Sequence, residues 1–216
     1  MSHFCVLVFT KPGGKNVEEL LAPFNENIEY KPYVEYTRDQ AIEKVRKDIE
    51  KYKNDVYAEY LADPKKYEEE WSHRPQHINY VKNIFPQKLK WTDNECYDYE
   101  ARRYEPEMIA ENGDLLSTHN LKSRWNWYTI GGRWDRLLKT KYGISDNIAY
   151  VSEVDWNETI PFAFITPDGE WHENGKMNWF GIVTDEKKES DWETEFMEFV
   201  QSLGSNVVAT VVDCRI

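Results

Sequence analysis

Residues 122–138, KSRWNWYTIGGRWDRLL, combine three of the chain's nine tryptophans with a glycine pair and four basic side chains. Indole rings stack on nucleobases, and arginine guanidinium groups bind phosphate oxygens in a bidentate manner. Adjacent glycines allow a positive φ, or let a ligand approach the backbone closely enough for N–H groups to bind phosphate. This stretch therefore holds the residue types that bind a nucleotide.

Periodicity also allows a purely structural interpretation of the same stretch. Trp125, Trp127 and Thr129 alternate with Asn126, Tyr128 and Ile130, which is the spacing of a β-strand with two indoles on one face. A hairpin whose tryptophans fill the core, with Arg133 exposed at its tip, would show the same pattern. Both interpretations stay open on the spacing alone.

The candidate ligand-binding residues are the aromatic side chains of this stretch, its glycine pair and its basic residues, together with one tyrosine upstream. Arg133 has the clearest phosphate-binding role because it directly follows the glycine pair, whereas Lys122 and Arg124 add positive potential. The full set is Trp125, Trp127, Tyr128, Gly131, Gly132, Arg133, Trp134, Lys122, Arg124 and Tyr36.

The charge distribution favours a small anion as the ligand. The chain carries 39 acidic and 27 basic residues, a net charge of −12, so a nucleic-acid polymer is not expected as a partner. Residues 122–141 nevertheless contain six basic residues and one acidic residue. An acidic protein with one basic patch suits a small anion, although these cations would also fit a surface rim paired to neighbouring acids.

Other chemistry is poorly supported by the sequence. His73 and His77 are four residues apart, but Pro75 between them argues against a regular helix that presents both to a zinc ion. The KPGGK turn at residues 11–15 resembles a phosphate-binding loop only weakly. No serine nucleophile signature or diagnostic carboxylate spacing stands out. We therefore expect no catalytic residues, no metal and no cofactor.

The ends of the chain predict two core strands of one mixed or antiparallel sheet, at residues 4–9 and 206–213, because both are apolar on both faces. Between them, PFAFITPDGEWHE predicts a hairpin and MNWFGIV a further strand. The stretch SDWETEFMEFVQSLG predicts a helix on one face of the sheet, with Ser190 and Glu193 as a capping box and Gly204 as its stop.

The middle of the chain predicts a helical insertion over residues 37–104. Apolar residues recur at helical spacing from Thr37, the expected N-cap, to about residue 61, where Asp-Pro ends the helix. Shorter helices are expected at about 65–72, 76–85 and 92–104, the last with a Thr92 to Glu95 capping box. The simplest organisation is a single α+β domain over residues 1–216.

The three cysteines, Cys5, Cys96 and Cys214, are too few and too scattered for a disulfide framework, so we expect them to be reduced. The opening MSHFCVLVF lacks the basic start of a signal peptide, and no apolar run approaches the roughly 20 residues of a membrane span. These features predict a soluble protein of the cytoplasm.

Several strings resemble a large family of phage proteins: MSHFCVLVF at the start, LAPFNEN at 21–27, VEYT at 34–37, YAEYLADP at 57–64 and WNWYTIGGRW at 125–134. The family is similar to viral sponge proteins that sequester the cyclic dinucleotide signals of bacterial CBASS immunity. This resemblance implies a homo-oligomer, dimer or tetramer, in the host cytoplasm that binds a ligand such as 3′3′-cGAMP without cleaving it. Asp135 stands where the family has a small residue, which implies a change of ligand preference.

Two other classes of function stay open. The first is an enzyme, a metal-dependent nuclease or phosphodiesterase that acts on nucleotides. The second is an inhibitor whose acidic surface binds a host protein.

Overall fold

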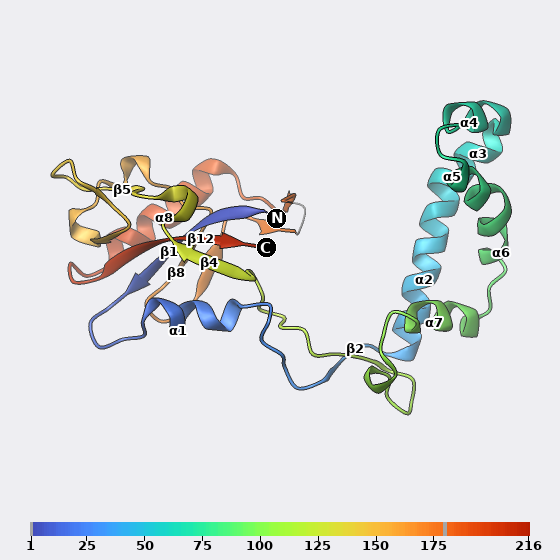
Figure 1. Cartoon of the computed structure of the whole chain (residues 1–216), viewed down its shortest axis with the longest axis horizontal. Helices are drawn as coiled ribbons and strands as arrows, with labels where there is room; N and C mark the ends of the chain where they lie inside the picture. Colours follow the sequence, from blue (N-terminus) through green and yellow to red (C-terminus); the bar gives the residue numbers. More distant parts are fainter. Residues whose placement is uncertain (1, 179–180) are drawn as a thin grey trace. The chain divides into compact units, whose positions relative to one another are not determined.

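The computed structural model describes residues 2–178 and 181–216 and divides the chain into two compact units (Figure 1). The first unit joins the two ends of the chain, Met1–Glu29 and His119–Ile216, and the second is Tyr30–Thr118. The helical insertion expected at about 37–104 therefore lies within a compact unit of its own, which also includes the strands that flank the helices.

The first unit is built on one mixed sheet, as predicted. Its strands pair in the order β4-β12-β1-β8-β9, and β7 also pairs with β12. The pairing is antiparallel except between β1 and β8, which run parallel. The strands are β1 (His3–Thr10), β4 (Trp127–Ile130), β7 (Ile148–Tyr150), β8 (Ala163–Ile165), β9 (Trp171–Glu173) and β12 (Val208–Arg215).

The two terminal strands lie inside this sheet. Strands β1 and β12 pair along eight residues each, from His3 opposite Arg215 to Thr10 opposite Val208. The six central residues of each strand are buried, because both faces of both strands are covered. This arrangement confirms the prediction of two terminal core strands, although β12 runs two residues further toward the C-terminus than expected.

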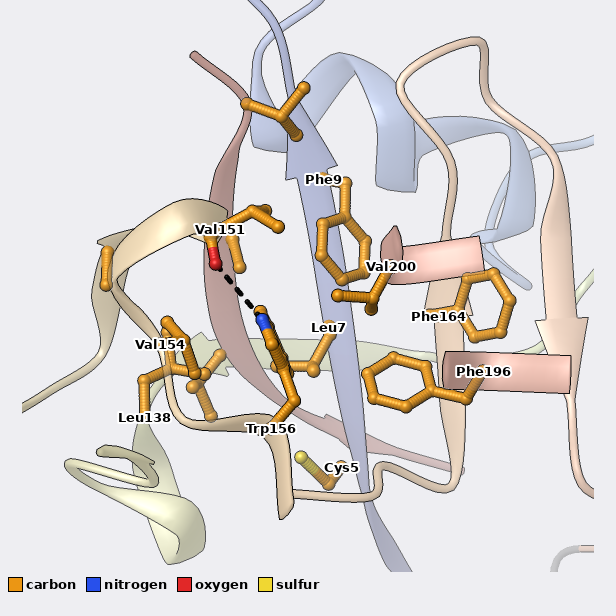
Figure 2. Close-up of a cluster of buried hydrophobic side chains, with 14 of the residues drawn as sticks. Cys5, Leu7, Phe9, Leu138, Val151, Val154, Trp156, Phe164, Phe196 and Val200 are labelled. Atoms are coloured by element: carbon orange, nitrogen blue, oxygen red, sulfur yellow. Dashed lines mark hydrogen bonds between the residues drawn. The ribbon is translucent and has the colours of Figure 1, made fainter. Parts of the chain in front are cut away.

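Helices pack on both faces of the sheet. Helix α8 (Glu189–Ser202) covers the face that carries Leu7 and Phe9 of β1, and Figure 2 shows Phe196 and Val200 of α8 within this cluster. The Trp156 indole joins the same cluster and donates a hydrogen bond to the Val151 carbonyl at 3.1 Å. The short α1 (Val17–Leu21) packs on the opposite face.

Helix α8 begins one residue before the expected cap. Lys188 is the N-cap residue and makes no capping hydrogen bond through its side chain, and the Ser190 hydroxyl donates to Asp191 instead. The predicted Ser190–Glu193 capping box is therefore wrong, because Ser190 already lies within the first turn. The acidic Glu189 and Asp191 in that turn interact favourably with the helix dipole.

The predicted hairpin and the predicted strand that follows it, near residues 161–184, had different outcomes. Strands β8 and β9 form the expected antiparallel hairpin. The MNWFGIV segment, predicted as one strand, instead contributes to a second hairpin of β10 (Lys176–Met177) and β11 (Val183–Thr184). Gly181 has a φ of 77°, and its N–H donates to the Asn178 carbonyl, so the chain reverses there. Trp179 and Phe180 of that segment lie outside the described residues.

The remaining strands of the first unit form a third small hairpin, β5 (Leu138–Lys139) with β6 (Ser145–Asp146). Short 3₁₀ turns complete the unit at Ala22–Phe24, Gly132–Trp134, Val151–Glu153 and Trp156–Glu158.

The second unit is mostly helical, as the periodicity predicted. Thr37 caps the first helix together with Gln40, and Thr92 forms the predicted capping box with Glu95. A strand pair, β2 (Tyr33–Tyr36) with β3 (Leu115–Ser117), and a 3₁₀ turn, Pro106–Met108, complete the unit. The helices are α2 (Arg38–Tyr52), α3 (Ala58–Ala62), α4 (Pro64–Glu70), α5 (Pro75–Asn79), α6 (Phe85–Lys88) and α7 (Asp93–Ala101), with π-helical segments at Lys53–Tyr57 and Tyr80–Ile84.

Among the helices of residues 2–178 and 181–216, none is long and apolar enough to cross a membrane.

Candidate functional site

Two rows of side chains cross β1, β12 and β4 at one end of the sheet. Directly opposed residues of antiparallel strands project from the same face, so the strand registers define each row. The first row holds His3, Arg215 and Trp127. The second row holds Cys5, Asp213 and Thr129. Both rows lie on the face that α8 covers, since they continue the register of Leu7 and Val211.

A buried histidine–carboxylate pair connects the two rows. His3 Nδ1 lies 2.8 Å from Asp213 Oδ1, and the two side chains are 8% and 2% exposed. Asp213 Oδ2 accepts a second hydrogen bond, from the backbone N–H of Arg133 at 3.0 Å. The carboxylate can only accept, so the proton of this bond is on Nδ1, and Nε2 has no partner among the described residues.

The glycine pair forms the turn that leaves room for this carboxylate. Gly131 and Gly132 have φ values of 72° and 58°, which is one of the two uses of the pair that the sequence allowed. A Cβ on Gly132 would lie 2.4 Å from the Asp213 side chain, so only glycine leaves room for it. The Gly131 N–H donates to the Val211 carbonyl at 2.9 Å. The backbone N–H groups of Gly131 and Arg133 are therefore not available to a ligand phosphate, because both already have acceptors within the fold.

Trp127 and Arg215 form the most open part of the site. The Arg215 guanidinium carbon lies 4.2 Å from the centre of the Trp127 ring, and Trp127 remains 47% exposed. The Nε of Arg215 is buried and has no hydrogen-bond partner within the described part of the chain. A flat ring and a guanidinium group thus lie together at the surface.

Trp125 and Trp127 do not share a face, which corrects the predicted strand pattern. Strand β4 begins only at Trp127. Trp125 is 5% exposed, and its indole N–H donates to the Leu21 carbonyl at 3.1 Å. Tyr128 packs edge-on against Trp125 at 5.1 Å, and burial raises the pKa of its hydroxyl. Both rings belong to the core on the opposite face of the sheet, so the structural interpretation holds for these two residues.

The basic residues of the stretch differ in their pairing. Arg124 binds Glu173 through Nε at 3.1 Å, so it is part of a paired surface rim rather than a free cation. Arg133 is exposed, and its guanidinium makes no ion pair among the described residues. Lys122 is also exposed, and no contact in this part of the chain joins its side chain to Trp127. Trp134 packs partly buried against the α8 cluster.

Tyr36 lies at the end of β2 in the second unit, where Lys44 lies 4.7 Å from the centre of its ring. In the KPGGK turn, the Gly14 N–H donates to the Lys11 carbonyl, and Lys11 pairs with Asp168. The turn is therefore an ordinary one, with its first lysine already paired.

The described residues contain no group of three or more histidine, cysteine or acidic side chains placed to hold a metal ion. His77 bonds to the Tyr67 hydroxyl at 2.7 Å, and its ring packs on Trp71.

The cysteines are free and buried, as expected. Burial, and secondarily the charge of Asp213, raises the pKa of the Cys5 thiol to about 12. Cys5 adjoins the candidate site but is not a nucleophile near neutral pH.

Sequence reasoning missed His3, Asp213 and Arg215, which the strand register brings to the glycine pair. One signal was present in the sequence. His3 begins an otherwise apolar stretch, and Asp213 and Arg215, two residues apart, end another. A polar side chain in a central strand requires a partner.

Comparison with known proteins finds no match to this chain among family models, curated proteins or solved structures.

Proposed function

We propose that this protein binds a cyclic dinucleotide, such as 3′3′-cGAMP, and sequesters it without cleaving it. The stack of the Arg215 guanidinium on the exposed Trp127 ring supports this most strongly. A nucleobase can stack on the open part of the indole, a contact worth about 1–3 kcal/mol. A guanidinium group in the same place binds phosphate oxygens. The two halves of a nucleotide would therefore be recognised side by side.

The hydrogen-bonding state of Arg215 also favours an anionic ligand. Its buried Nε lacks an acceptor among the described residues, and such an unsatisfied donor costs about 1–3 kcal/mol. The Nε itself is closed to a ligand, so a phosphate oxygen would bind the terminal N–H groups of the same guanidinium. Arg133 bonds to Asp213 of the neighbouring row through its backbone N–H, and its exposed side chain adds a second guanidinium group.

The charge of the whole chain agrees with a small ligand. Acidic residues exceed basic ones by twelve, so the positive charge of Arg133 and Arg215 is a local feature of an acidic protein. The surrounding negative charge opposes the close approach of a nucleic-acid polymer, whereas a small anion can meet the local positive charge alone.

The resemblance to phage proteins supports the setting of this proposal. The protein would be phage-encoded and act in the host cytoplasm, where removing the signal would block CBASS defence. We also propose a homo-oligomer, dimer or tetramer, because a ligand with twofold symmetry suits a site shared by symmetric subunits. Light scattering on the 25.8 kDa chain, with and without ligand, tests this, and a monomer under both conditions would contradict it.

A thermal-shift panel of cyclic oligonucleotides tests the proposed function. A ligand at 100 times its dissociation constant stabilises the protein by about 2.7 kcal/mol. Chromatography of the recovered nucleotide should return it intact. If no member of the panel shifts the unfolding temperature, the proposal is wrong.

The His3–Asp213 pair favours one alternative, a phosphodiesterase. A histidine oriented through Nδ1 by a carboxylate, with Nε2 free, is the arrangement of a general base. Nε2 would take a proton from the water that attacks phosphorus, while the departing ester oxygen takes a proton from solvent. Linear product that forms with wild-type protein and not with His3→Gln would support this alternative, and Mg²⁺ and Mn²⁺ arms would reveal a metal-dependent reaction.

A further inference from the structure

A groove on the first unit lies away from the two rows. This groove has a volume of about 500 Å³ and lies beside β7, bordered by the turn that joins β5 to β6. Volumes of this size are typical of binding sites.

Large apolar side chains surround the groove and are open to solvent. Tyr142 and Ile144, in the β5–β6 turn, are 76% and 61% exposed. Ile148 and Tyr150, on β7, are 49% and 50% exposed. Single exposed apolar residues are common, but four around one groove indicate a binding surface.

Strand β7 also has an open backbone edge in this groove. Within the described part of the chain it pairs only with β12, where the Val151 N–H donates to the Val207 carbonyl and the Asn147 carbonyl accepts from the Val211 N–H. In this antiparallel ladder, Ile148 and Tyr150 direct their backbone groups away from β12. The Tyr150 N–H and the Ile148 carbonyl have no partner among the described residues, whereas the Tyr150 carbonyl accepts the first hydrogen bond of the 3₁₀ turn Val151–Glu153. An open strand edge of this kind is a template for another extended chain.

The charge of the groove is negative. Glu153 lines it and makes no ion pair within the described part of the chain. Asp146 also lines it, and among the residues that the structure describes its carboxylate accepts only from the backbone amides of Asn147 and Ile148. No lysine or arginine is among the lining residues. A cationic occupant would neutralise these carboxylates.

We propose that β7 is a docking edge for an extended segment of a partner protein, with apolar side chains at alternate positions and a basic residue at its end. The segment would add to the sheet as a strand beside β7, accept a hydrogen bond from the Tyr150 N–H, donate one to the Ile148 carbonyl and place its apolar side chains in the groove. A second copy of this chain fits less well, because it would bring its own Asp146 and Glu153 to the same negative edge.

The first test uses a synthetic peptide, acetyl-Lys-Val-Thr-Val-Lys-amide, added to the ¹⁵N-labelled full chain. The expected result is a saturable shift of the Ile148 and Tyr150 amide signals. The same peptide with glutamate in place of both lysines should bind at least about tenfold more weakly, since one charge-assisted contact accounts for such a factor. Two methylated peptides test the backbone pairing: one is N-methylated at the central threonine and the other at both valines. Because a paired strand uses alternate amides, one of these two peptides should no longer bind.

A pair of protein variants isolates the backbone contact. Tyr150 has a φ of −66°, the angle that proline requires, and its N–H points away from β12. Tyr150→Pro should therefore keep the fold while removing the N–H. Tyr150→Ala removes the same ring and keeps the N–H. We expect the proline variant to bind the peptide at least about tenfold more weakly than the alanine variant, the factor for one lost hydrogen bond.

Four outcomes would overturn the proposal. Equal peptide affinity of the two variants would show that no backbone pairing occurs. Peptide shifts confined to residues outside the groove would place the contact elsewhere, and no saturable shift would show that the edge does not bind such segments. Line broadening of the groove amides that depends on protein concentration alone would identify a second copy as the occupant.

Discussion

The ring of His3 and the carboxylate of Asp213 are 210 residues apart in sequence and 2.8 Å apart in the structure. The register of β1 on β12 places them diagonally across one face, and the turn at Gly131 and Gly132 brings the Arg133 N–H to the other carboxylate oxygen. The motif that attracts attention in the sequence is thus tied to both ends of the chain. Its backbone holds a carboxylate of the protein, and among its side chains those of Trp127 and Arg133 stay exposed.

The His3–Asp213 contact should appear as an energetic coupling. Asp213→Ala leaves two donors without an acceptor, so the free energy of unfolding should fall by about 1–3 kcal/mol. A double-mutant cycle with His3→Ala, measured by urea unfolding, should give a coupling of about 0.5–3 kcal/mol. If the effects of the two substitutions are additive, the His3–Asp213 contact has no coupling energy.

Gly132→Ala should be more harmful than the same change at other glycines with positive φ. The new Cβ would lie 2.4 Å from Asp213, and the backbone conformation adds a strain of about 1–2 kcal/mol. Gly13→Ala is the matched control, since Gly13 has a φ of 72° but nothing lies within 4 Å of its Cβ position. If the two variants lose equal unfolding free energy, the close approach of Gly132 to Asp213 does not affect stability.

The two neighbouring tryptophans should respond differently to truncation. Trp125→Ala removes a buried ring and should lower the free energy of unfolding by about 3–5 kcal/mol. Trp127→Ala affects a half-exposed ring and should cost no more than about 1 kcal/mol, the scale of an exposed cation–π contact. Chemical denaturation of the two variants tests this, and a similar loss in both would contradict the burial difference.

The Cys5 thiol should make stability fall at high pH. Burial, and next the Asp213 charge, raises its pKa from 9.0 to about 12 in the folded state. Below pH 9 the thiol is protonated in both states, so its contribution is fully present. Between pH 9 and 12 only the unfolded state loses the proton, and stability is lost as pH rises. The unfolding free energy of wild type should fall more steeply there than that of Cys5→Ala, by about 1.4 kcal/mol per pH unit; parallel slopes would exclude this effect.

The strands and helices that could be predicted are those with long, unmixed patterns. The apolar ends of the chain predicted β1 and β12, because only a central strand buries both faces. Thr37 marked a helix start as an N-cap, and Thr92 did so together with Glu95. Ser190 misled because α8 begins two residues earlier than a Ser190 cap implies, with acidic residues in its first turn.

The candidate site was only half predictable. Local spacing identified Trp127, the glycine pair and Arg133, but local spacing carries no information about which distant strand lies beside them. Arg215 reaches Trp127 through the register of β12 on β4. Trp125 was misassigned because two indoles at a spacing of two suggested one strand face, whereas β4 begins after Trp125.

The most direct test of the central claim is calorimetric titration of 3′3′-cGAMP into wild type, Arg215→Gln and the matched control Arg46→Gln. Arg46 pairs with Asp93 in the second unit, so its loss should leave affinity unchanged. Glutamine at position 215 removes the guanidinium above Trp127, and we expect an affinity loss of about ten- to a hundredfold, with a similar loss for Arg133→Ala. Wild-type affinity in folded Arg215→Gln, or no binding by the wild type, would contradict the claim that this face of the sheet binds the nucleotide.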